Sequence, residues 1–392
     1  MKETVILSAV RTPIGSYLGA LKSIPAPKLG AIAIREAVKR SNVPKDKIDE
    51  VLMGCVLTAG LGQAPARQAA IFAELPQSVR CTTVNRVCAS GLKAVMFGSQ
   101  MIRVGDASFV VAGGMESMSR VPYYLEKARE GFRLGHKQVL DGMIFDGLWD
   151  VYNNIHMGDC AELCAKEKKF SRSDQDRFAV QSYQRALAAI EKGEFKNEIV
   201  GCEVVEGKKS EWVETDEEPA RGNLSKFSDL KPAFQKDGTV TAANASSLND
   251  GAVALVLADS ELAGQLGLKP IARIVGEASF AQAPEWFTTA PIGAVQKLLK
   301  KTGKKVEEVD LFELNEAFSV VGLACNKDLG LPEAKVNVRG GAVALGHPIG
   351  ASGARILTTL IHALRDRKGR LGVAAICNGG GEASALMVEA VY

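Results

Sequence analysis

Short apolar runs alternate with amphipathic stretches along the chain, a pattern typical of an α/β protein. Residues 4–10, TVILSAV, form an apolar run that predicts a strand, and residues 28–40 carry a helical pattern. A turn and a second apolar run follow within residues 44–56. The order strand, helix, strand is the signature of an α/β unit.

A second unit begins at Cys88, where a polar segment gives way to apolar residues at helical spacing. These apolar residues are Leu92, Val95, Met96 and Ile102. Gly105 and Asp106 end the predicted helix, and residues 108–114, SFVVAGG, form a short apolar run. Such a run predicts a strand that is buried on both faces.

The pattern changes between residues 115 and 249, a region that opens with a segment rich in methionine, glycine and aromatic residues. We expect one helix here, opened by Ser173 and Asp174 and closed near Gly193, followed by a charged and poorly periodic stretch over residues 203–236. This segment therefore reads as an inserted loop region with some helix, after which the α/β pattern resumes.

An internal repeat relates the two ends of the chain. Residues 88–117 and 350–384 share Ala-Ser-Gly, an apolar residue, a basic residue, a helix, an apolar strand and a glycine-rich end, at a separation of 262 positions. Residues 47–52 and 308–313 match at nearly the same separation. A shared offset predicts two copies of one α/β half, with the insertion carried by the first copy.

Composition narrows the class of protein. With 392 residues and 46% hydrophobic content the chain can build more than one core unit, and a net charge of +3 favours no nucleic-acid partner. Eight cysteines without CxxC pairs indicate free thiols in a reducing compartment. The first strand begins almost at Met1 with no leader or apolar span before it, so we expect a cytoplasmic protein with no membrane partner.

Cys88 is the first candidate for chemistry. It lies at or just before a helix N-terminus, where unpaired N–H groups and the helix dipole favour an anion and are expected to lower the pKa of a thiol. That arrangement predicts a nucleophile. The alternative is that Cys88 is a small buried apolar residue.

Three further candidates lie in loops of the second copy. His347 is in a glycine-rich loop, Cys377 ends the apolar run VAAIC before NGGGEAS, and Asn315 follows the run DLFEL. Each could be structural, but their occurrence together at strand ends favours a site. Two cysteines, a histidine and hydrogen-bond donors for an oxyanion suit thioester exchange coupled to making or breaking a carbon–carbon bond.

Four blocks in order, VNRVCASGLKAV, NEAFS, GHPIGASGAR and CNGGGEAS, resemble the signature blocks of the thiolases. The similarity extends over essentially the entire chain and is greatest to the short-chain, acetoacetyl-CoA type. It implies that Cys88 is the acylated nucleophile, His347 its general base and a donor to the substrate oxygen, and Cys377 the acid and base for the α-proton. Asn315 would hold a water in one oxyanion hole, and the N–H groups of Cys88 and Gly379 would form the other.

The resemblance also implies the thiolase fold, an α/β fold of two duplicated five-layered αβαβα halves with an inserted loop domain. The expected N-terminal half is residues 1–118 with 248–269, the loop domain is 119–247, and the C-terminal half is 270–392. Thiolases usually assemble as tetramers, so we expect a homotetramer.

Coenzyme A contacts carried over from the family fall mainly on the insertion. They are Leu148, His156, Met157, Arg221, Phe234, Ala243, Ser246 and Phe318. The methionine of the HMG block is thought to shorten the acyl pocket of short-chain thiolases. Two departures, Ala243 in place of the usual glycine and Phe287 in EWFTTAP, are closer to the potassium-stimulated mitochondrial branch.

The expected activity is reversible condensation of two acetyl-CoA to acetoacetyl-CoA and CoA, without a tightly bound cofactor. A broad-range 3-ketoacyl-CoA thiolase of β-oxidation is the first alternative. A decarboxylating ketoacyl synthase fits less well, because such enzymes typically lack a second cysteine in a CxGGG-like block. A thiolase-like lipid carrier is the non-enzyme alternative.

A potassium site is the last expectation. The loop TAANAS offers the carbonyl groups of Ala242, Ala243 and Ala245, neutral donors that suit a large and weakly hydrated cation. Tyr183 and Val343 match the remaining positions of the potassium-stimulated thiolases. The alternative is an ordinary turn closed by its own hydrogen bonds.

Overall fold

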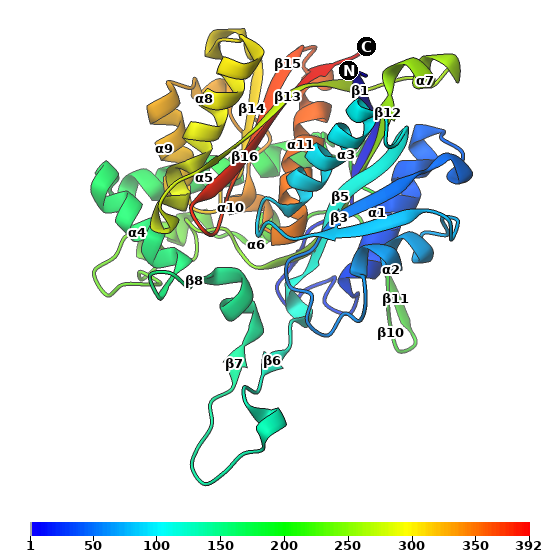
Figure 1. The fold of residues 1–392 in the computed structure, drawn as a ribbon. Coiled ribbons are helices and arrows are strands. Elements are labelled where there is room, and N and C mark those ends of the chain that lie inside the picture. The colour runs from blue at the N-terminus through cyan, green and yellow to red at the C-terminus, as the bar shows by residue number, and fades with distance from the viewer. Residues whose placement is uncertain (1) are drawn as a thin grey trace.

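The computed structural model describes residues 2–392, and a long mixed sheet runs through its centre (Figure 1). The hydrogen-bonded order is β14-β15-β16-β13-β1-β12-β5-β3-β4, with the short β2 beside β12. The strands are β1 Thr4–Arg11, β2 Gly15–Ser16, β3 Glu50–Gly54, β4 Arg80–Val84, β5 Phe109–Ser117, β12 Asn249–Asp259, β13 Ala272–Ala281, β14 Leu311–Leu314, β15 Leu371–Asn378 and β16 Glu382–Ala390.

Counted from the middle of the sheet, the strands of the two halves follow the same order, as the repeat predicts. The order β3-β5-β12-β1 is matched by β14-β15-β16-β13, and β1 meets β13 through the antiparallel pair Val5 and Arg273. In each copy the aspartate just before β3, or before its counterpart β14, accepts two backbone N–H groups at the start of the neighbouring parallel strand, β5 or β15. Asp49 accepts from residues 108 and 109 at 2.7 and 2.9 Å, and Asp310 accepts from residues 370 and 371 at 2.7 and 2.8 Å. The predicted duplication is therefore confirmed.

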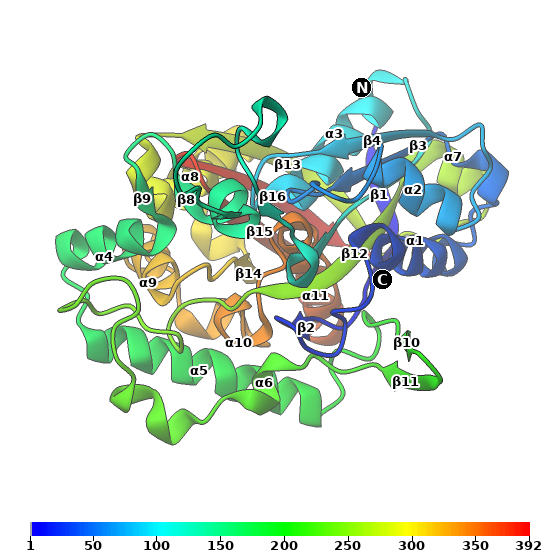
Figure 2. The same ribbon diagram turned by 90° about the horizontal axis from the view of Figure 1, so that it is seen from below.

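The two halves form five layers jointly, because each contributes one outer helix layer, its part of the sheet and one central helix. Figure 2 shows α11 (Ile349–Asp366) at the centre, where it packs on α3 (Ser90–Val104). On one side are α1 (Ala26–Ser41) and α2 (Pro65–Phe72), and on the other are α8 (Ala290–Thr302) and α9 (Ser319–Leu329). This is the layered α/β architecture that the resemblance implies, except that the two halves share the five layers and do not each contain five.

The insertion lies between β5 and β12 and packs mostly on the C-terminal half. Its hairpin of β6 and β7 projects from the body (Figure 1), while α5 packs on α9 and α10. Its elements are β6 Tyr123–Tyr124, β7 Leu140–Asp141, β8 Trp149–Asp150, β9 Ile155–His156, α4 Met157–Lys168, α5 Arg172–Glu191, β10 Cys202–Glu206, β11 Lys209–Val213 and α6 Glu218–Arg221. The remaining short helices are α7 Ser260–Gln265 and α10 Ala342–Leu345.

Three details of the insertion differ from the sequence prediction. It contains a second long helix, α4, where only one helix was expected. The cap of α5 is Ser171, whose hydroxyl accepts from the Asp174 N–H while the Asp174 carboxylate accepts in return, so the helix begins before Ser173. The charged stretch contains the hairpin of β10 and β11, in which Cys202 and Val204 are buried. Only these two buried residues show the alternation of apolar and polar positions that is typical of a strand. The alternation is too short to be recognised among the surrounding charged residues.

None of the helices within residues 2–392 combines the length and the apolar character needed to cross a membrane.

Candidate active site

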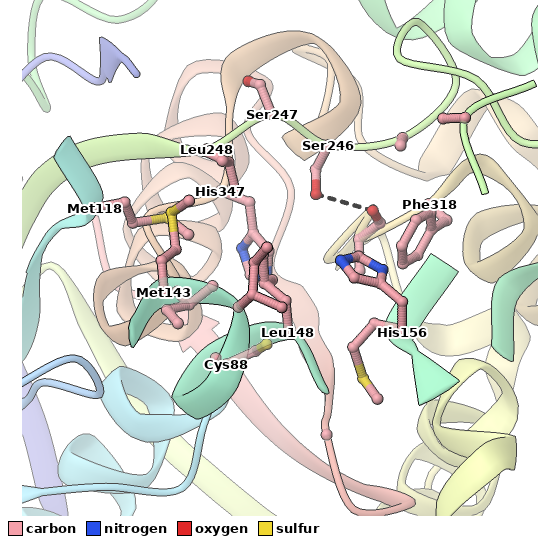
Figure 3. Close-up of a pocket in the computed structure, with 18 of the residues that line it drawn as sticks. Cys88, Met118, Met143, Leu148, His156, Ser246, Ser247, Leu248, Phe318 and His347 are labelled. Atoms are coloured by element: carbon pink, nitrogen blue, oxygen red, sulfur yellow. Dashed lines mark hydrogen bonds between the residues drawn. The ribbon is translucent and has the colours of Figure 1, made fainter. Parts of the chain in front are cut away.

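A cavity of about 410 Å³ lies where loops of both halves and the insertion meet (Figure 3). Most of the expected site residues line it. They are Cys88, Leu148, His156, Met157, Phe234, Ser246, Phe318, His347 and Gly379. Further lining residues that were not anticipated include Met118, Met143, Ile144, Ser247, Leu248 and Ile349.

Cys88 stands two residues before α3, at the end of a strained turn. Val87 has a φ of 46°, in the left-handed region that a β-branched residue rarely enters. The Ser90 hydroxyl supports this turn, because it accepts from the Arg86 N–H at 2.8 Å and donates to the Val87 carbonyl at 2.6 Å. The turn thus directs the Cys88 thiol into the cavity, as Figure 3 shows.

The expectation that the helix N-terminus lowers the pKa of Cys88 is wrong for this structure. Burial raises the pKa of the thiol to about 12, and the N–H groups of Gly379 and Cys88 offset only part of that increase. The Glu116 carboxylate raises it further. Desolvation exceeds the helix effect, so Cys88 is a neutral thiol that needs a base in order to attack.

His347 is held in one tautomer by its surroundings. Its Nδ1 lies 2.6 Å from the Ser352 hydroxyl, and that hydroxyl donates to the Pro348 carbonyl at 2.9 Å. Because the single hydroxyl proton is used there, Nδ1 must carry the proton that it shares with Ser352. Within residues 2–392 Nε2 has no hydrogen-bond partner, so it is free to accept a proton.

The imidazole is also kept uncharged. Burial, and then the charge of Arg355, lower the pKa of His347 to about 3. The backbone position is fixed as well, because the His347 N–H donates to Asn249 Oδ1 at 2.7 Å. A neutral, oriented imidazole in the wall that also holds Cys88 is the arrangement a general base requires.

Cys377 is the last residue but one of β15 and is buried behind the cavity wall. Burial raises the pKa of its thiol well above the usual range, and Cys88 adds to the increase, which indicates that the two sulfur atoms are neighbours. Asn315 is buried as well, and within residues 2–392 neither atom of its side-chain amide has a hydrogen-bond partner. An amide left free in this way can hold a water or a substrate oxygen.

Several of the residues expected to contact coenzyme A, among them His156 and Phe318, form an aromatic side of the cavity (Figure 3). The His156 ring stacks on Phe234 at 4.8 Å between centroids, and Phe318 meets Phe234 edge-on at 6.2 Å. The Ser246 hydroxyl donates to the Ala317 carbonyl at 2.8 Å. An apolar slot with few polar groups suits a pantetheine arm.

Two of the expected contacts lie apart from this cavity. Arg221 is an exposed residue of α6 that pairs with Glu217 at 3.3 Å, and it does not belong to the lining. Ala243 packs in a separate cluster beneath the loop, although its neighbours Ala242 and Ala245 do line the cavity.

Three of the five residues expected at a potassium site lie in one buried cluster, while Ala242 and Ala245 line the cavity. Tyr183, Ala243 and Val343 share one buried cluster, and the carbonyl groups of Ala242, Ala243, Ala245 and Val343 accept no backbone hydrogen bond within residues 2–392. That part of the chain also holds no group of three or more His, Cys, Asp and Glu side chains able to bind a metal. The donors present are neutral oxygens, which fit a large monovalent cation.

Ser352 and Asn249 are the positioning residues that sequence reasoning missed. Ser352 lies inside the GASGAR block, five residues after His347 and one turn into a helix. This spacing could have identified it from the sequence. Asn249 lies about a hundred residues away in sequence, so only the fold brings it to His347.

Comparison with known proteins agrees with this geometry. The model of the thiolase N-terminal domain matches residues 4–261, and that of the thiolase C-terminal domain matches residues 268–390. The chain is 54% identical to acetyl-CoA acetyltransferase 2 of Arabidopsis thaliana, over 99% of this chain and 97% of that protein. It is 51% identical to the mitochondrial acetyl-CoA acetyltransferase of Bos taurus, over 99% and 92% respectively. The crystal structure of the Acat5 thiolase from Ascaris suum in complex with coenzyme A matches with a TM-score of 0.95 and 48% identity, covering 100% of both chains.

Proposed function

This chain belongs to the thiolase family, and from that premise we propose that it is an acetyl-CoA C-acetyltransferase. It condenses two acetyl-CoA to acetoacetyl-CoA and CoA, or runs the reverse thiolysis. The observation that carries the proposal is the shared wall of Cys88, His347 and Gly379, in which His347 Nε2 has no partner within residues 2–392.

The first half-reaction transfers an acetyl group to the enzyme. His347 Nε2 takes the proton of the Cys88 thiol as the sulfur attacks the thioester carbonyl. The N–H groups of Cys88 and Gly379, which already act on the thiol, stabilise negative charge at this point. The bond to the CoA sulfur then breaks. Because burial raises the pKa of Cys377, its thiol is protonated at rest and supplies the proton that CoA needs.

The second half-reaction forms the carbon–carbon bond. The Cys377 thiolate takes an α-proton from a second acetyl-CoA, and Asn315 with a bound water stabilises the enolate oxygen. The enolate attacks the acetyl group on Cys88, whose sulfur leaves and regains its proton from His347. Each thiol and the imidazole thereby return to their starting state.

Two variants test this division of roles. Cys88→Ser should take up no acetyl group from acetyl-CoA, while Cys377→Ala should be acetylated and yet fail to condense. Mass spectrometry of the intact protein measures the acetyl group, and acetoacetyl-CoA formation measures condensation. A native enzyme that gained no acetyl group would be a thiolase-like carrier, and a Cys377→Ala variant that condensed at the native rate would refute the role of Cys377.

The quaternary structure is also a proposal: the protein is a homotetramer. The arm of β6 and β7 supports it, since Tyr123, Leu125, Phe132 and Leu134 are exposed there. Light scattering after gel filtration should give four times the mass of the chain, and replacing the exposed arm residues by serine should lower that mass. A native protein that stayed monomeric would contradict the proposal.

We further propose that potassium binds beside the loop that carries Ser246. The supporting observation is the cluster of Tyr183, Ala243 and Val343, in which the carbonyl groups of Ala243 and Val343 accept no backbone hydrogen bond within residues 2–392. A cation there would stiffen the loop, so exchanging potassium for sodium at constant ionic strength should raise the KM for coenzyme A more than it changes kcat. Unchanged kinetics and thermal stability would remove the site.

For the location in the cell, we propose the cytoplasm, and subcellular fractionation tests it. Recovery of the protein with mitochondria, the location printed in the name of the bovine relative, would refute the proposal.

A further inference from the structure

A cluster of buried polar side chains lies behind the reaction cavity. All three guanidinium nitrogens of Arg355, both carboxylate oxygens of Glu313 and both amide atoms of Asn315 have no hydrogen-bond partner within residues 2–392. Each of the three side chains is 1% exposed. Arg355 Nη1 and Glu313 Oε2 lie 3.6 Å apart, close enough for an ion pair but too far for a good hydrogen bond.

The fold aims this cluster at the catalytic residues. Arg355 follows Ser352 by one turn of α11, so the two share the helix face that supports His347. Glu313 lies on β14, and Asn315 is the first residue after the strand, which ends at Leu314. The Asn315 N–H still donates to the Ala375 carbonyl of β15 at 3.0 Å, so the two-residue step keeps its side chain on the face of Glu313. Leu311 precedes Glu313 by the same step and packs in the core that α11 forms, so this face turns toward α11. The lowering of the His347 pKa by Arg355 also indicates that the guanidinium is close to the imidazole.

The repeat shows that the fold does not require a buried cation at this place. The equivalent residue of the first copy is Lys93, the basic residue of CASGLK, as Arg355 is that of GASGAR. Lys93 is half-buried, and its ammonium lies over the Phe97 ring at 4.6 Å from the centroid. A basic residue at this helical position can therefore reach the surface, and only the copy beside His347 turns it inward.

Such a cluster is costly unless water completes it. A buried neutral polar group without a partner costs about 1–3 kcal/mol, and a buried charge costs more. The guanidinium alone carries five N–H donors, and the carboxylate and the Asn315 side-chain carbonyl are acceptors without protein partners within residues 2–392. Buried polar groups that lack protein partners are typically satisfied by ordered water.

We propose that Arg355 and Glu313 are positioning residues for condensation. Together with enclosed water, they hold the Asn315 amide in the orientation that directs a water onto the substrate oxygen. Arg355 and Glu313 lie on the side of Asn315 that faces away from the substrate. Through the enclosed water they hold the Asn315 amide in place, so that it does not rotate to bond another protein group. This inference rests on the proposed function and on the role of Asn315 within it.

The decisive test separates positioning from stability. Arg355→Met leaves Glu313 buried and unpaired, which is destabilising, whereas the double variant Arg355→Met/Glu313→Leu removes both buried polar groups and should fold with near-native thermal stability. We expect the double variant to be acetylated at Cys88 at nearly the native rate. Its kcat for condensation should fall about tenfold to a hundredfold, with the KM for acetyl-CoA within about twofold of the native value.

Two further variants complete the experiment. Arg355→Lys keeps the charge and should recover part of kcat, and Lys93→Met, the matched change in the first copy, should leave kcat unchanged. A double variant that condenses at the native rate would overturn the proposal, since the cluster would then serve stability alone. A native enzyme that is not acetylated at all would instead refute the proposed function, so the two failures are distinguishable.

Discussion

Gly91 on α3 and Gly353 on α11 meet across the pseudo-twofold axis in a reciprocal contact. A Cβ atom on Gly91 would lie 3.0 Å from the backbone nitrogen of Ala354, and one on Gly353 would lie 2.6 Å from that of Leu92. The repeat offset makes Ala354 the counterpart of Leu92, so each glycine faces the residue after the other. This close approach brings the start of α3, which follows Cys88, next to the start of α11, which follows His347.

The first prediction tests this contact. Gly353→Ala should lower the free energy of unfolding by about 1–3 kcal/mol, because the methyl group meets backbone that cannot move aside. Gly264→Ala is the matched control, since a Cβ there meets nothing within 4 Å and the helix should gain slightly. Urea unfolding measures both variants. If Gly353→Ala were as stable as Gly264→Ala, the helices would not be held together by this contact.

The second prediction concerns the tautomer of His347. In Ser352→Ala the imidazole Nδ1 loses its partner at 2.6 Å, so the ring can turn or exchange tautomers. We expect the rate of Cys88 acetylation to fall about tenfold to a hundredfold with little change in KM. Ser41→Ala is the control, because Ser41 is another buried helical serine that donates to a backbone carbonyl, that of Val38. An equal loss in both variants would point to general destabilisation.

The third prediction follows from the raised pKa of Cys88. A thiol with a pKa of about 12 holds little thiolate at neutral pH, so alkylation by iodoacetamide should be slow there. Its rate should rise about tenfold per pH unit toward alkaline pH, as the thiolate fraction does below the pKa. The measurement uses Cys377→Ala to avoid reaction at the second thiol. A rate already constant at neutral pH would mean that the helix N-terminus and His347 form a stable thiolate.

Much of the fold could be predicted because the same sequence features occur in both copies of the repeat. The aspartates at positions 49 and 310 precede matching strands, and the two Ala-Ser-Gly blocks open matching helices. The joining of the halves could not be predicted in the same way. It depends on β1 meeting β13 through very few residue pairs, and such an edge contact leaves no periodic signal in the sequence.

The catalytic residues of the candidate site could be predicted because the chemistry requires particular residue types. Their pKa values and orienting partners could not, because these depend on segments that are distant in sequence. Cys88 and His347 lie together in the cavity wall, as their blocks predict. The pKa of Cys88 could not be inferred, because local position favours a low value while burial by distant segments raises it. The orienting role of Asn249 is likewise a tertiary effect, since the residue belongs to β12 and is remote from His347 in sequence.

The fourth prediction concerns the length of the acyl chain. Met157 begins α4, is 7% exposed and lines the cavity, and its sulfur would lie 3.7 Å from a Cβ atom on Gly379. The Gly379 N–H group acts on the Cys88 thiol. Met157 therefore lies beside the position that an acyl group bound to Cys88 would occupy. We therefore expect thiolysis of acetoacetyl-CoA to exceed that of 3-ketooctanoyl-CoA by at least about a hundredfold in kcat/KM.

Met157→Ala should reduce the ratio of kcat/KM between acetoacetyl-CoA and 3-ketooctanoyl-CoA. Removing the methionine side chain makes room for the longer acyl chain, while the C4 substrate loses contacts. Met101→Ala is the control. Met101 lies on α3, is only partly buried and packs against the central core away from the cavity, so its loss should change stability but not the ratio of the two substrates. Equal activity of the native enzyme on both substrates would instead favour the broad-range thiolase of β-oxidation. A native preference that Met157→Ala left intact would mean that other lining residues, such as Met143 or Phe287, limit the chain.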